Sequence, residues 1–263
     1  MECFIKWLVI PVLTKTTKST SMKRILPVFL GILLPICGFA DQQADIEQLK
    51  GNLTKEMPEL TISEIKTTPI DGLYQLITGS RLFYLTPDLK YAFRGSIIEL
   101  DSQTDITARD QGKLSMQAIE NIGEQNMVIF EPKEGKAERT ITVFTDTSCP
   151  YCARLHEEVP TLNEAGIRVR YLLYPRAGIG SDAHKVLQSI WCSDDRQQAL
   201  TDAKAGKDIG EKSCDNPIPQ HMELARLVGL QGTPLIFTDA GEMVSGYRPA
   251  NILIESIKNS KPL

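Results

Sequence analysis

The chain has 263 residues, of which 42% are hydrophobic and 24% are charged, and its formal net charge is −4. This length allows one large domain or two smaller ones. A mildly acidic chain without a run of basic residues in its body lacks the charge that nucleic-acid binding requires, so we exclude nucleic acid as a partner.

The first 40 residues have the pattern of a secretory signal. Met22, Lys23 and Arg24 form a basic start, the apolar segment 25–39 follows, and small residues precede a cut after Ala40. About 15 apolar residues are too few for a comfortable membrane span, so we predict cleavage near Ala40 and a mature protein that is not membrane-anchored. Because a complete signal begins at Met22, that residue is an alternative start of translation.

Removal of the signal also removes Cys3 and Cys37. A lipid anchor on Cys37 is disfavoured, because the bulky Ile36 precedes it. The mature chain keeps four cysteines, and four cysteines in an exported protein suggest two disulfides with three connectivities. The cysteines that remain are Cys149, Cys152, Cys192 and Cys214.

Residues 41–103 are predicted to form a small β-rich module. An amphipathic helix at residues 44–53 precedes four extended segments, which are separated by the turn sequences PIDG, TGS and TPDLK. The extended segments are residues 60–66, 72–78, 81–86 and 91–100. A module of about 60 residues buries little core, and we interpret it as a dimerisation domain.

Residues 104–139 are predicted to connect this module to a second domain. Apolar residues at helical spacing and a stop at Gly123 indicate a linker helix over residues 105–123. The strand-like segment 126–130 and a polar stretch complete the connection.

Residues 140–263 follow the order β-α-β, helical insertion, β-β-α. The strand 140–146 leads into the cysteine pair, a helix runs to about Ala165, and a second strand covers 167–174. A long helical stretch is expected over residues 181–229. The segments that follow it are a hairpin at residues 233–247 and a closing helix at residues 249–259.

The segment CPYC, residues 149–152, carries the candidate chemistry. A helix that starts here places Cys149 at its N-terminus, where free N–H groups and the helix dipole stabilise a thiolate. Pro150 fits the first turn, and Cys152 lies one turn further in, placed to resolve a mixed disulfide.

Two other interpretations of the pair stay open at this point. Cys149, Cys152 and His156 are three candidate zinc ligands, but the sequence offers no second ligand set beside them. We therefore expect no metal, and we expect His156 to be a polar helix residue, with catalytic base as the lesser reading. A structural disulfide is disfavoured because so tight a loop is easily reduced.

Thr233 and Pro234 form the second element of the candidate site. They directly precede an apolar strand, and a cis bond between them would bring Pro234 against the cysteine pair. The free backbone groups of Thr233 would then be available to an extended substrate. The sequence alone does not reveal a cis bond.

Five segments together resemble the DsbC/DsbG family of periplasmic protein-disulfide isomerases. They are TITVFTDTSCPYCARLHEE, GIRVRYLLYPRAGIGSDA, SIWCSDDRQQAL, GKDIGEKSCDNPI and GLQGTPLIFTDAGEMVSGYRP. The resemblance implies an α+β N-terminal dimerisation domain (41–103) and a linker helix and connecting segment (104–139). An α/β thioredoxin-fold catalytic domain with a helical insertion (140–263) is implied to follow the connection.

The resemblance also implies the roles of individual residues. Cys149 is the nucleophile, Cys152 is the resolving thiol, and the two form the redox-active disulfide. Thr233 and Pro234 form the cis-proline loop. The structural disulfide of the family matches Cys192 and Cys214.

The function implied is isomerisation of incorrect disulfides in exported proteins by a periplasmic homodimer, with chaperone activity. No cofactor is implied, and the implied partner is the membrane reductase DsbD. Pro150 and Tyr151 match the DsbG form of the motif, whereas the best-known DsbC site has Gly-Tyr, so a DsbG-like substrate range is one alternative. The other is a monomeric thiol oxidase of the DsbA class, which has no need of residues 41–103.

Overall fold

The computed structural model describes residues 37–133 and 135–263, with side-chain surroundings from residue 43 onward. The alternative start at Met22 and the apolar segment of the predicted signal lie outside the described residues, apart from residues 37–40, which open the first helix. None of the helices within the described ranges combines the length and apolar character needed to cross a membrane.

The N-terminal part is a helix packed on a four-stranded antiparallel sheet. Leu49 and Leu53 of the helix lie against Ile65, Leu76 and Leu85 of the sheet. The elements are α1 (Cys37–Glu56), β1 (Glu64–Thr67), β2 (Tyr74–Thr78), β3 (Arg81–Leu85) and β4 (Ala92–Phe93), with strand order β1-β2-β3-β4. The predicted helix and the first three predicted extended segments are therefore present, with bounds that differ from the predicted ones.

The fourth predicted segment, residues 91–100, is not one strand. Its first part is β4 at the sheet edge, and its second part is β5 (Ile98–Glu99), which pairs with β6 (Thr104–Asp105) in a separate ladder. Gly95 lies between the two, where the chain leaves the sheet.

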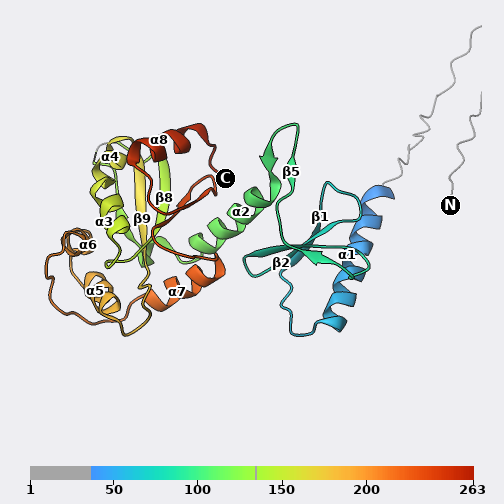
Figure 1. The fold of residues 1–263 in the computed structure, drawn as a ribbon, viewed down its shortest axis with the longest axis horizontal. Coiled ribbons are helices and arrows are strands. Elements are labelled where there is room, and N and C mark those ends of the chain that lie inside the picture. The colour runs from blue at the N-terminus through green and yellow to red at the C-terminus, as the bar shows by residue number, and fades with distance from the viewer. Residues whose placement is uncertain (1–36, 134) are drawn as a thin grey trace, which may run out of the picture.

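Helix α2 (Ile106–Glu120) joins the two parts of the molecule, as Figure 1 shows. Asp105 caps its N-terminus by accepting a hydrogen bond from the backbone N–H of Ala108. Toward its C-terminus Ile119 is fully buried in a cluster with Phe144 and Leu172 of the second part. The linker helix predicted at residues 105–123 is thus docked on the second part.

The second part is built on a five-stranded sheet of order β11-β10-β8-β9-β7. Only the central pair β8–β9 is parallel. The strands are β7 (Val128–Phe130), β8 (Arg139–Thr145), β9 (Ile167–Leu173), β10 (Leu235–Thr238) and β11 (Met243–Ser245); the short 3-10 helix η1 (Glu124–Asn126) precedes β7.

The sheet begins before residue 140, which differs from the predicted boundary. Segment 126–130 was expected in the connection, but β7 pairs with β9 and buries Val128. Three apolar residues do not reveal by periodicity whether they join a distant strand, because pairing is a long-range contact.

Helices cover both faces of this sheet. Alternate residues of β8 point to opposite faces, so Ile141 and Val143 face one cluster while Phe144 faces the other. The first cluster lies under α3, α4, α5, α6 and α8, and the second under α2 and α7. The helices are α3 (Pro150–Glu157), α4 (Val159–Glu164), α5 (Asp182–Trp191), α6 (Arg196–Lys204), α7 (Ile218–Leu227) and α8 (Ala250–Asn259).

Two of the helices predicted from the sequence are interrupted. The helix expected from the cysteine pair to Ala165 is divided at Glu158 into α3 and α4. The long helical stretch expected at 181–229 contains three helices, and residues 205–217 between α6 and α7 are irregular. Gly206 and Gly210 have positive φ there, a conformation that ends a right-handed helix.

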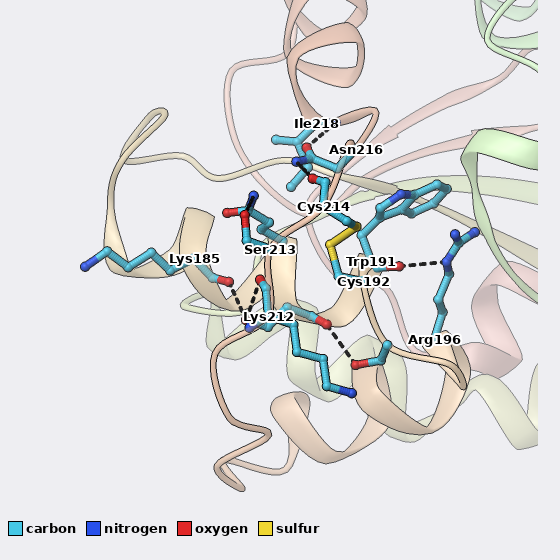
Figure 2. Close-up of a disulfide and its surroundings, with 12 residues drawn as sticks. Lys185, Trp191, Cys192, Arg196, Lys212, Ser213, Cys214, Asn216 and Ile218 are labelled. Carbon is cyan, nitrogen blue, oxygen red and sulfur yellow. Dashed lines mark hydrogen bonds between the residues drawn. A yellow bond between two sulfur atoms is a disulfide. The ribbon is translucent and has the colours of Figure 1, made fainter.

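A disulfide holds this irregular segment against α5 (Figure 2). Cys192, at the C-terminal end of α5, is bonded to Cys214, with Cα atoms 5.8 Å apart and a sequence separation of 22. This is the pairing that the family resemblance implied. Nearby, the backbone N–H of Lys212 donates to the Ser189 hydroxyl at 3.0 Å. Closing a loop of this length stabilises the fold by about 3 kcal/mol in the chain-entropy description.

The docking of α2 depends on a contact between two glycines. A Cβ atom on Gly112 of α2 would lie 2.2 Å from the carbonyl oxygen of Gly241, in the turn between β10 and β11. Gly241 has φ +77°, so its backbone adopts the left-handed conformation in this turn. Glycine at position 112 therefore allows the helix and the turn to approach each other.

We predict that Gly112→Ala lowers the thermal stability of the protein. The forced shift of the helix or turn costs about 1–3 kcal/mol, which exceeds the gain of up to about 1 kcal/mol from better helix propensity. Gly51→Ala in α1 is the matched control, because nothing lies within 4 Å of its added Cβ. Scanning calorimetry should show a lower melting temperature for the first variant and an unchanged or higher one for the second. An equal rise in both would contradict the contact.

Candidate active site

The turn from β8 into α3 is organised by the buried carboxylate of Asp146. One carboxylate oxygen accepts hydrogen bonds from the backbone N–H and the hydroxyl of Ser148, at 2.8 and 2.9 Å. The other accepts from the backbone N–H and the Nε of Arg176, at 3.0 and 2.9 Å. Asp146 thus ties the turn to the segment that follows β9.

Cys149 occupies the N-cap position of α3. Pro150 follows in the first turn, and the backbone N–H groups of Cys152 and Ala153 both donate to the Cys149 carbonyl at 3.1 Å. Both thiols are unbonded and buried. The helix N-terminus favours negative charge on the Cys149 sulfur.

The Thr233–Pro234 peptide bond is cis, and this loop lies beside Cys149. The Cys149 thiol donates a hydrogen bond to the Thr233 carbonyl at 3.3 Å, across 84 positions of sequence. Pro234 is buried, whereas Tyr151 is 59% exposed. The fold thus places Cys149 next to the Thr233–Pro234 loop and leaves Tyr151 facing solvent.

The pKa values of the two thiols are shifted in opposite directions from the ordinary value of a cysteine. Burial alone would raise the pKa of Cys149, but the neighbouring polar groups of Thr233 and Cys152 and the positive charge of Arg176 outweigh it, so its pKa lies below the ordinary value. The pKa of Cys152 is raised, because burial dominates over the positive charge of Lys204. Cys149 is therefore the thiol that ionises first.

His156 belongs to the structural interior and not to the cysteine pair. Its Nδ1 lies 3.1 Å from the Tyr171 hydroxyl and its Nε2 lies 3.0 Å from the Thr201 hydroxyl. Burial lowers its pKa to about 4. Both ring nitrogens lie at hydrogen-bonding distance from hydroxyl groups. This geometry favours neither zinc binding nor base catalysis by His156. Across the described residues, no group of three or more His, Cys, Asp or Glu side chains is arranged for a metal ion.

Sequence reasoning missed three residues beside the pair. Asp146 directly follows β8, and Arg176 lies three residues after the end of β9; side chains at such positions often reach a site, and this signal was available. Lys204 ends helix α6, and its amine donates to the Thr145 hydroxyl at 2.6 Å and to the Asp146 carbonyl at 2.8 Å. Nothing in the local sequence distinguishes this lysine from an ordinary surface residue.

A cysteine pair at the start of a helix, opposite a cis-proline loop on a mixed sheet, defines a thioredoxin-like thiol-disulfide oxidoreductase. Residues 129–261 match the family described as "Thioredoxin-like domain", and residues 40–108 match "Disulfide bond isomerase protein N-terminal domain".

Two relatives are similar over most of their length. The chain is 36% identical to the thiol:disulfide interchange protein DsbC of Dickeya dadantii over 87% of this chain and 92% of that protein. It is 34% identical to DsbC of Escherichia coli K12 over 83% of this chain and 89% of that protein. A crystal structure of a disulfide interchange protein from Neisseria gonorrhoeae matches 54% of this chain and 99% of its own chain, at 29% identity and a TM-score of 0.48. The chain belongs to the DsbC family of thiol:disulfide interchange proteins.

We predict that Arg176→Gln raises the pKa of the Cys149 thiol, because it removes a positive charge that stabilises the thiolate. Only the thiolate is alkylated, so at about pH 6 the reaction of Cys149 with iodoacetamide should slow about two- to tenfold. The variant and its parent should converge at alkaline pH, where both thiols are ionised.

The measurement uses a Cys152→Ser background, in which Cys149 is the free thiol of the catalytic pair. Arg154→Gln is the control: Arg154 is on the same helix, but its guanidinium lies over the Tyr247 ring at 4.8 Å. Its pH profile should match that of the parent. A midpoint that does not move in Arg176→Gln would contradict the assigned electrostatics.

Proposed function

We propose that Cys149 is the attacking thiol and Cys152 the resolving thiol of a disulfide isomerase that acts on exported proteins. The observation that carries the proposal is the unequal acidity of the two thiols, with the more acidic one at the N-terminus of α3. A nucleophile must be ionised before the substrate arrives, whereas a resolving thiol is better kept protonated until it is needed.

The isomerisation pathway conserves electrons. The Cys149 thiolate attacks one sulfur of an incorrect disulfide, that bond breaks, and a substrate thiolate is released while a mixed disulfide forms. A substrate thiolate then attacks a different sulfur, the correct disulfide forms, and Cys149 leaves as the thiolate. Neither the enzyme nor the substrate is oxidised overall.

The resolution pathway transfers two electrons. If the rearrangement stalls, Cys152 attacks the Cys149 sulfur, the substrate leaves with a reduced thiol, and the enzyme is left with a Cys149–Cys152 disulfide. A thiol reductant must then restore the dithiol. The family resemblance assigns this role to a DsbD-type membrane reductase.

The cis-proline loop is proposed to position the substrate. Thr233 and Pro234 lie beside Cys149, and an extended substrate segment can pair with backbone groups of Thr233 as an added strand does. Pro150 and Tyr151 at the rim are proposed to tune the redox potential. Their identity favours a DsbG-like substrate range as the second candidate.

The active form is proposed to be a periplasmic homodimer, exported by the signal that ends near Ala40. Four large apolar side chains on and beside β4 and β5 are exposed, a surface that a second copy would cover. They are Tyr91 at 68%, Phe93 at 45%, Ile98 at 53% and Leu100 at 85%. The match of residues 40–108 to an isomerase N-terminal domain supports this over the monomeric oxidase. Chaperone activity is proposed to accompany isomerisation.

We predict that the wild-type protein restores activity to a scrambled multi-disulfide substrate in a glutathione buffer. Cys149→Ser should abolish the rescue because no mixed disulfide forms. Cys152→Ser should retain part of the isomerisation and lose net reduction, because only the resolution pathway needs Cys152. Activity recovered by the substrate is the readout.

Aggregation of a reduced substrate serves as the control for chaperone activity. Cys149→Ser should still suppress aggregation, because that activity depends on apolar surface. Absence of rescue by the wild type would contradict the isomerase function, and full rescue by Cys149→Ser would contradict the assigned nucleophile.

A further inference from the structure

Lys204 is held beneath the first turn of α3. Its amine donates to the Thr145 hydroxyl at 2.6 Å and to the Asp146 carbonyl at 2.8 Å. The same carbonyl accepts the backbone N–H of Cys149 at 3.3 Å. The amine therefore shares a hydrogen-bond acceptor with the residue that begins the catalytic helix.

Helix α6 is fixed against α3 one turn before Lys204. Thr201 lies three residues earlier on α6, and its hydroxyl is 3.0 Å from Nε2 of the buried His156 on α3. Residues at this spacing share a helix face, so Thr201 and Lys204 both point toward α3. The position of the amine is thus set by contacts to two elements of the site.

The arrangement suits an amine that changes its charge. A neutral amine has two N–H donors and one lone pair, so both hydrogen bonds persist in either state and the third position holds a proton or a lone pair. Burial lowers the pKa of Lys204 to about 8, so a fraction of the amine is neutral at neutral pH. The positive charge of the same group lowers the pKa of Cys152 against the opposing effect of burial.

We propose that Lys204 accepts the proton of Cys152 when Cys152 resolves a mixed disulfide; this rests on the roles proposed above for the two cysteines. The Cys152 S–H bond breaks, its proton moves to the lone pair of Lys204, and the thiolate attacks the Cys149 sulfur. The mixed disulfide breaks, the substrate sulfur leaves with the electron pair, and the proton of Lys204 returns to solvent.

A cavity lined in part by Lys204 is the proposed route for that proton. Its volume is about 790 Å³, it is partly open to solvent, and Lys204 lines it together with Ala153 and Thr201. The amine end of the side chain is buried, and the residue as a whole is partly exposed and lines the cavity.

The charged and titratable groups around Lys204 come from every neighbouring element. Cys149, Cys152 and His156 face it from α3, Asp146 from the turn after β8, and Arg176 from the segment after β9. The cavity is also lined by Glu131, Lys133, Glu157 and Glu164. Of the two thiols, the pKa of Cys152 is the one on which the Lys204 charge is a main influence.

A two-phase reaction with one equivalent of 5,5′-dithiobis(2-nitrobenzoate), DTNB, tests the proposal. Cys149 attacks first and releases one thionitrobenzoate, and Cys152 then attacks the Cys149 adduct and releases the second. The leaving group needs no protonation, so the second phase reports the deprotonation and attack of Cys152. Stopped-flow absorbance follows both phases across the pH range.

Lys204→Met should slow the second phase at neutral pH by about tenfold or more and move its midpoint to higher pH. The first phase should change less than about twofold. Lys204→Arg keeps a positive charge but does not give up its proton near neutral pH, so it should not restore the second phase. Lys207→Met is the matched control, because Lys207 pairs with Asp202 outside the site, and both phases should match the wild type.

The outcomes separate this inference from the proposed function. A wild-type second phase that persists in Cys152→Ser would overturn the role of Cys152 itself. A normal second phase and pH midpoint in Lys204→Met would overturn the role of Lys204 and leave the cysteine roles intact. Full recovery in Lys204→Arg would overturn proton acceptance in favour of a fixed charge. Equal slowing of both phases would indicate a purely structural lysine and would also overturn the proposal.

Discussion

The candidate site depends most on Asp146, a fully buried carboxylate at the end of β8. Its two carboxylate oxygens accept from Ser148 and Arg176, and its backbone carbonyl accepts from Cys149 and Lys204. Burial alone would raise the pKa of Asp146, but these hydrogen bonds to its carboxylate hold the pKa below the ordinary value, so the group stays charged. One residue, through its carboxylate and its backbone carbonyl, thus fixes where α3 begins and brings two cations to the thiols.

The consequence for chemistry is that the two thiols are placed in unlike surroundings although they are three residues apart. Cys149 has the helix N-terminus, the Thr233 loop and the charge of Arg176. Cys152 is one turn deeper, where burial keeps the proton on the sulfur. A protein that rearranges disulfides, and only sometimes reduces them, needs this difference in acidity. A resolving thiol that ionised early would attack each mixed disulfide and release the substrate reduced before it could rearrange.

Much of this arrangement could be predicted from the sequence. The strand, the cysteine pair and the helix after it form a local pattern, and the resemblance of the segments around Cys192 and Cys214 implied a bond that the structure contains. The order of strands and helices in residues 140–263 was also correct, because periodicity and turn residues are local signals.

What could not be predicted depends on contacts between distant segments. The three residues of β7 have no signal that they pair with β9, and the break at residues 205–217 follows from glycine conformations within a helix-like composition. Lys204 is the clearest case, since a lysine near the end of a polar helix is expected to face solvent. Only the packing of α6 on α3 turns its amine toward Asp146.

The most direct test of the account is to trap the mixed disulfide. Cys152→Ser is incubated with a scrambled substrate, free thiols are blocked, and the cross-linked peptides are mapped by mass spectrometry without reduction. We predict that every substrate cysteine cross-linked to the enzyme is bonded to Cys149 and that the Cys192–Cys214 bond is intact. Substrate bonded to Cys192 or Cys214, or no covalent complex at all, would contradict it.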